Sequence, residues 1–130
     1  MTQEEFQEFV AQDAHVAGPL GRAARKMQPA RFGLPTEAAL VVVLFPLVQY
    51  MLTKFGLPWL SELRRYSEVQ RRRVHEWIDE HYREHGYDPD AAEAASDALV
   101  DELEATTDAQ SRQSWEKLAG LLKADPRSSG

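Results

Sequence analysis

Residues 38–60, AALVVVLFPLVQYMLTKFGLPWL, form the most apolar stretch of the chain. Seventeen of these 23 residues are hydrophobic, and between residues 38 and 48 only Pro46 interrupts the run. A helix of this length would measure about 34 Å, close to the thickness of a bilayer core. This helix must therefore be buried either by the rest of the chain or by a membrane.

The composition of this stretch leaves both interpretations open. Leu, Val and Phe at the centre of a membrane helix each favour insertion by about 0.3 to 0.6 kcal/mol, whereas Gln49, Pro46 and Lys54 oppose it. A helix that is apolar all round is equally typical of the centre of a bundle. A buried strand over residues 41–43 is a third option, but no second strand is evident to pair with it. Exposure separates the membrane helix from the core helix at four positions: Val42, Phe45, Val48 and Leu52.

The remaining patterns predict an all-α fold of five to six helices. Thr2 and Glu5 form a capping box that begins an amphipathic helix, which Gly18 and Pro19 are expected to end. Residues 1–34 would thus hold this helix and a basic linker, and residues 35–60 the apolar helix. Gly56 is expected to end the apolar helix.

The C-terminal half is predicted to form a long helix followed by a helical hairpin, together spanning residues 58–123. The long helix would run from Pro58 to about His85, because its apolar positions keep a helical spacing. Asp88 and Pro89 predict the start of the next helix, with Asp as N-cap and Pro at the first helical position. Residues 124–130 are expected to form a tail.

Three consecutive arginines on the predicted long helix are the candidate contact with a partner or a phosphate group: Arg71, Arg72 and Arg73. Glu68 and Glu76 lie at helical ion-pair spacings from them, so a solvated, self-neutralised face is the alternative interpretation. The net charge of −6 disfavours nucleic acid as a partner. Residues 22–60 carry +4 and residues 86–108 carry −8, so these segments could also dock on each other.

We find no sequence signature of catalysis. The chain has no cysteine, no glycine-rich phosphate loop and no nucleophile motif. His81 and His85 are four residues apart and could share a metal, but no third ligand is evident, and histidines near a helix end also interact favourably with the helix dipole. We therefore expect no enzyme activity, no cofactor, no metal and no small-molecule substrate.

The sequence thus predicts a small, non-catalytic helical protein. The favoured function is a membrane-associated adaptor or scaffold that is anchored by its apolar helix and presents its C-terminal helices to a protein partner. The alternative is a soluble helical bundle that self-associates or joins a larger assembly, with the same helix as core. A nucleic-acid or phosphate-binding accessory protein is a weaker alternative. The acidic N-terminus lacks the basic start of a signal peptide, so we expect a location in the cytoplasm or on the cytoplasmic face of a membrane.

Overall fold

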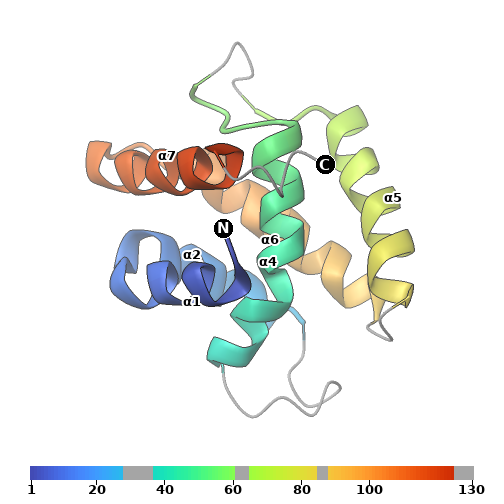
Figure 1. The fold of residues 1–130 in the computed structure, drawn as a ribbon. Coiled ribbons are helices and arrows are strands. Elements are labelled where there is room, and N and C mark those ends of the chain that lie inside the picture. Colours follow the sequence, from blue (N-terminus) through green and yellow to red (C-terminus); the bar gives the residue numbers. More distant parts are fainter. Residues whose placement is uncertain (28–36, 61–64, 85–87, 125–130) are drawn as a thin grey trace.

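A computed structural model describes residues 1–27, 37–60, 65–84 and 88–124, with the side chains of residues 37–42 and 84 excepted. These residues form six helices and no strand, which confirms the all-α prediction. Residues 28–34 of the predicted basic linker, His85 and the tail from residue 125 lie outside the described residues. The helices α1, α2 and α7 lie on one side of α4, while α5 lies on the other side and α6 crosses behind (Figure 1).

The N-terminal region forms two helices where one was predicted. The capping box of Thr2 and Glu5 begins α1 (Gln3–Gln12) as expected, but Asp13 adopts an extended conformation and begins α2 (Ala14–Arg25) by accepting the N–H of His15. Pro19 lies inside α2 instead of ending it. Its missing N–H leaves the carbonyl of His15 without a helical donor, and that exposed residue can bond water instead. Pro19 itself is buried, which offsets the cost.

The apolar stretch forms α4 (Glu37–Lys54), which Gly56 terminates at a φ of 80° as predicted. Pro46 lies inside this helix and removes one backbone hydrogen bond. Close to that point the hydroxyl of Tyr82 donates to the carbonyl of Val43 at 2.6 Å. This contact joins α4 to α5 where the proline weakens the helix.

The long helix predicted from Pro58 is shorter than expected, because α5 spans only Glu68–Glu84. Residues 58–60 form a turn and residues 65–67 are not helical. Ser67 and Gln70 exchange hydrogen bonds in a capping box, which gives α5 its own start, while the N–H of Tyr66 donates to Glu104. These contacts satisfy backbone groups that a continuous helix would have satisfied itself.

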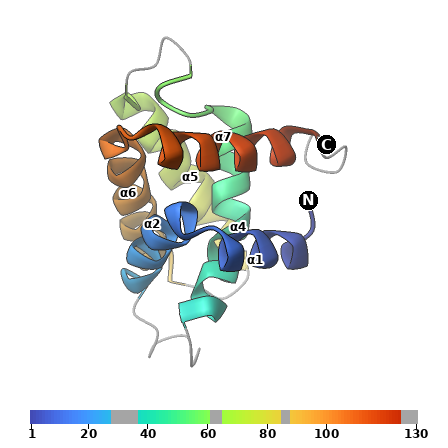
Figure 2. The ribbon, with the colours of Figure 1, turned by 90° about the vertical axis from the view of Figure 1, so that its left-hand side faces the viewer.

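The predicted C-terminal hairpin is not formed, although both of its helices are present. Helix α6 (Pro89–Ala105) begins at Asp88 and Pro89 as predicted, and α7 (Ala109–Ala124) begins at Asp108, whose carboxylate accepts the N–H of Ser111. The two helices point in very different directions (Figure 2). Helix α6 packs on α2 and α5, whereas α7 packs on α2 and α4.

Helix α4 is part of the core of this bundle. Val48 and Leu52 are almost fully buried, and Phe45 is half-buried against the ring of Phe6, at 4.8 Å between centroids. The side chain of Val42 lies outside the described part of the structure. Among the described residues, no helix is both long and apolar enough to cross a membrane. The prediction of a transmembrane helix is therefore not supported.

We predict that Leu52→Ala lowers the free energy of unfolding by about 2 to 5 kcal/mol, because it leaves a cavity among packed side chains. The matched control is Leu121→Ala, since Leu121 is also helical but is 43% exposed and should change stability by less than about 1 kcal/mol. Chemical denaturation followed by circular dichroism measures both. Equal effects would show that Leu52 does not lie in the core.

Candidate functional site

The three consecutive arginines of α5 lie in different environments. Arg71 lies on the side of α5 that faces α6, together with the buried Val74 and Ile78, while Arg72 and Arg73 are exposed. A turn of 100° per residue accounts for this separation. The sequence grouped the three arginines into one candidate site. In the structure Arg71 pairs with carboxylates of the same chain, while Arg72 and Arg73 are surface cations.

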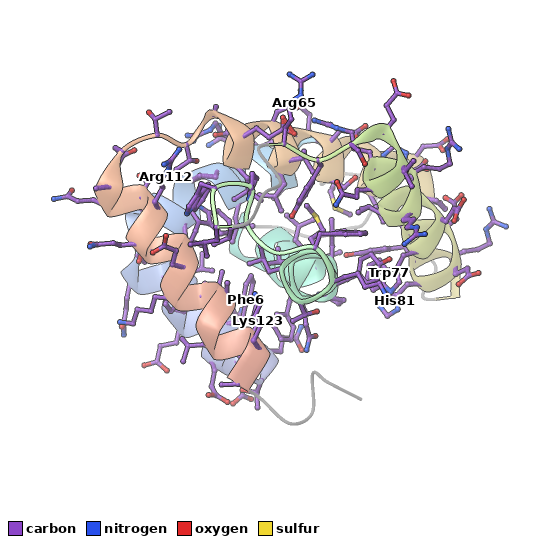
Figure 3. The ribbon with its side chains drawn as sticks, turned by 90° about the horizontal axis from the view of Figure 1, so that it is seen from above. Phe6, Arg65, Trp77, His81, Arg112 and Lys123 are labelled. Carbon is purple, nitrogen blue, oxygen red and sulfur yellow. The ribbon has the colours of Figure 1, made fainter. Side chains whose placement is uncertain are left out.

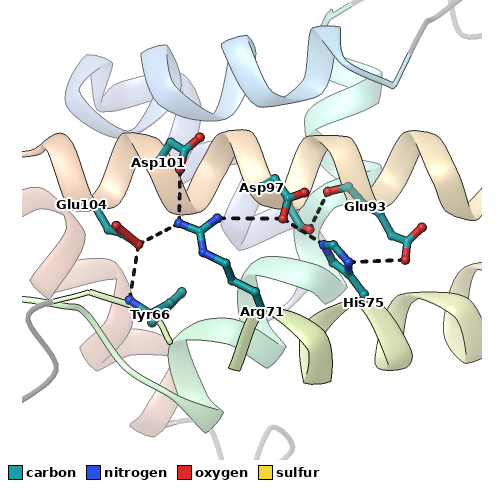
Figure 4. A network of polar contacts seen from close by, with 8 residues as sticks. Tyr66, Arg71, His75, Glu93, Asp97, Asp101 and Glu104 are labelled. Atoms are coloured by element: carbon teal, nitrogen blue, oxygen red, sulfur yellow. Dashed lines mark hydrogen bonds and ion pairs between the residues drawn. The ribbon is translucent and has the colours of Figure 1, made fainter. Parts of the chain in front are cut away.

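Arg71 lies at the centre of a polar network between α5 and α6 (Figure 4). Its Nη2 is 2.9 Å from Oε1 of Glu104 and 3.2 Å from Oδ1 of Asp101, and its Nη1 is 4.0 Å from Oδ1 of Asp97. Glu104 also accepts the N–H of Tyr66. One guanidinium thus neutralises part of the acidic segment that the sequence placed in residues 86–108.

His75 continues this network one turn further along α5. Its Nε2 lies 2.8 Å from Oδ1 of Asp97, and its Nδ1 lies 3.5 Å from Oε1 of Glu93. Burial raises the pKa of Glu93, Asp79 raises it further by repulsion, and His75 opposes the rise. The network is thus a polar seam that fixes α5 on α6 and leaves Arg71 occupied.

A stack of three rings connects α5 to α4. The indole of Trp77 lies between Tyr50 and His81, with centroids 4.7 and 4.6 Å away and interplanar angles of 6° and 10°. Trp77 and His81 project from α5 toward α4 (Figure 3). All three side chains are partly exposed. Burial raises the pKa of Tyr50, while Arg73 lowers it and Glu76 raises it, so these two charges act on the edge of the stack.

A second polar cluster lies between α2 and the start of α7. Oγ of Ser111 is 3.1 Å from Nδ1 of His15, beside a bidentate pair of Arg22 and Glu102 at 2.6 and 3.0 Å. These residues line an open cleft of about 310 Å³. The sequence offered no signal for this cluster, because Ser111 and His15 are 96 residues apart.

This cluster resembles a nucleophile and a base, but among the described residues no hydrogen-bond donors are arranged beside them to stabilise a developing negative charge. His15 is exposed, and the carboxylate of Asp108 occupies the N-terminus of α7, where a developing negative charge would need hydrogen-bond donors. Hydrogen bonds that Ser111 donates to the carboxylate of Asp108 lower its pKa, so this carboxylate stays ionised at the N-terminus of α7. Among the described residues, no group of His, Cys, Asp or Glu is arranged to hold a metal ion.

No protein-family model matches the chain, and no curated protein or solved structure matches it significantly.

We predict that Arg71→Met destabilises the protein by about 1 to 2 kcal/mol, because it leaves the carboxylates of α6 without their cation in a partly buried seam. Arg72→Met is the matched control and should change stability by less than about 0.5 kcal/mol, since Arg72 is exposed. Denaturant unfolding at low and high salt measures the effect, which should shrink as salt screens the charges. Equal losses for both variants would contradict a special role of Arg71.

We also predict a pH-dependent effect of Glu93→Gln. The raised pKa of Glu93 means that the folded state binds its proton more tightly than the unfolded state does. The wild type therefore loses stability as pH rises from the ordinary glutamate pKa through the raised value. The variant lacks this loss, so its stability relative to wild type should increase across that acidic range and then level off. A relative stability that falls with rising pH would show that the ion pair with His75 dominates.

Proposed function

We propose that the chain is a non-catalytic protein-interaction module whose contact surface is the outer face of α5. We define this face by its exposed side chains: Val69, Arg72, Arg73, Glu76, Glu80 and Arg83. The proposal takes the bundle alternative derived from the sequence, in which the apolar helix is core, and adds the contact through C-terminal helices that the favoured prediction included.

The position of α5 supports this proposal. The helix lies at the edge of the bundle, with its inner side turned toward α6 and α4 (Figures 1 and 3). Val69 is 56% exposed, and the partly exposed Trp77 lies beside the charged residues. Tryptophan and arginine are the side chains that most often dominate the binding energy of protein interfaces. The exposed Val69 and three exposed arginines on one face of α5 are the observation that carries the proposal.

The charges of this face favour a protein over a lipid or nucleic-acid partner. Two glutamates separate the third arginine of this face from the first two, so the face presents no continuous positive stripe to phosphate groups. Arg71, the third member of the predicted phosphate contact, is occupied by carboxylates of α6. A mixed pattern of charges instead provides register and specificity between two proteins.

The test places a photo-crosslinking amino acid at position 72 or 76 of the full chain, in the cells from which the sequence comes. We expect light-dependent adducts with protein from both positions. The control is position 117, because Lys117 is exposed on α7 and lies outside the proposed surface. An adduct yield at positions 72 and 76 no higher than at position 117 would overturn the proposal.

A further inference from the structure

Building on this proposed function, we propose that the partner is a second copy of the same chain. The two copies pack antiparallel through the outer faces of α5, and Arg73 of each copy pairs with Glu80 of the other.

Arg73 and Glu80 are both available for such a pairing. Both are exposed, and none of the ion pairs among the described side chains includes either of them. They share one face of α5 but are seven residues apart, so about 10 Å of helix separates them and they cannot pair within one chain. Both charges are therefore free to pair with residues of another molecule.

The order of the charges favours an antiparallel over a parallel arrangement of two copies. In a symmetric pair of parallel helices, each residue faces its own equivalent, so Arg73 would face Arg73 and the charges would repel. In an antiparallel pair that aligns position 73 with position 80, both symmetry-related contacts join an arginine to a glutamate. The midpoint of this register lies between residues 76 and 77, next to the centre of α5 (Glu68–Glu84), so residues 69–84 of the two helices overlap.

The same register places positions 76 and 77 of each copy level with the two-fold axis. Trp77 projects from α5 toward α4, where it stacks on Tyr50 and His81. The contact between the copies is therefore formed by the charged side chains of the outer face. A different antiparallel register, which aligns position 76 with position 80 and position 73 with position 83, would bring like charges together at all four contacts.

The test is sedimentation velocity of the purified full chain over a range of concentrations, with a set of charge variants. We expect a monomer–dimer equilibrium that Arg73→Glu or Glu80→Arg each weakens roughly tenfold or more, because each change replaces two attractive contacts by two repulsive ones. The double variant R73E/E80R should recover the wild-type dimer. A mixture of the two single variants should form heterodimers, because every contact between them is again attractive.

Arg83→Glu is the matched control, because it lies on the same face but is opposite Gln70 in this register and should leave dimerisation nearly unchanged. Circular dichroism checks that each variant is folded. A wild type that stays monomeric at all concentrations would overturn the proposal, as would a dimer that R73E and E80R do not weaken or that the double variant does not recover. Photo-crosslinking of a different protein at position 76 of a monomeric chain would reject the second copy alone, whereas the absence of any adduct there would also reject the interaction function.

Discussion

Burial of α4 is the constraint on which the arrangement of the other helices depends. The helix is apolar on nearly every side, and one neighbour cannot cover it. Helices α1, α2 and α7 share this role, and they do so with buried side chains such as Phe6, Leu20 and Trp115. The break at Asp13 lets α1 and α2 run in different directions, and both pack on α4. The steep angle between α6 and α7 lets α7 pack on α4 as well. These departures from the simplest helical pattern therefore have a common cause.

The attachment of α5 follows a different principle, because large rings bridge the space between α4 and α5. The stack centred on Trp77 and the hydrogen bond from Tyr82 to Val43 reach across it, while the polar seam of Arg71 and His75 joins the opposite side of α5 to α6. Aromatic rings and charged groups both favour particular orientations, unlike aliphatic contacts. The rotation of α5 about its axis is thereby fixed, and so is the set of charges that it turns outward.

Local signals in the sequence were reliable where a residue acts on its own backbone. The capping box of Thr2, the N-cap at Asp88 and the termination at Gly56 were predicted because each depends on neighbours only a few residues away. The start of α5 at Ser67 carries an equally local capping signature, but the apolar spacing that runs across it concealed the break. Pro19 failed as a stop signal because an exposed carbonyl can bond water and because the proline itself is buried, and both depend on tertiary structure.

The candidate site was harder to predict, because three adjacent arginines differ only in their rotation about the helix. Arg71 shares a helix face with the buried Val74 and Ile78. Its position three and seven residues before these apolar residues could by itself have predicted that it turns toward the rest of the bundle. The carboxylates that pair with it lie some 30 residues away, and no spacing rule identifies them. Because Arg71 pairs with α6, the cations of the arginine triplet that remain exposed are Arg72 and Arg73, which face away from the core. Ion pairs within the chain thus determine which charged side chains of α5 remain exposed at the surface.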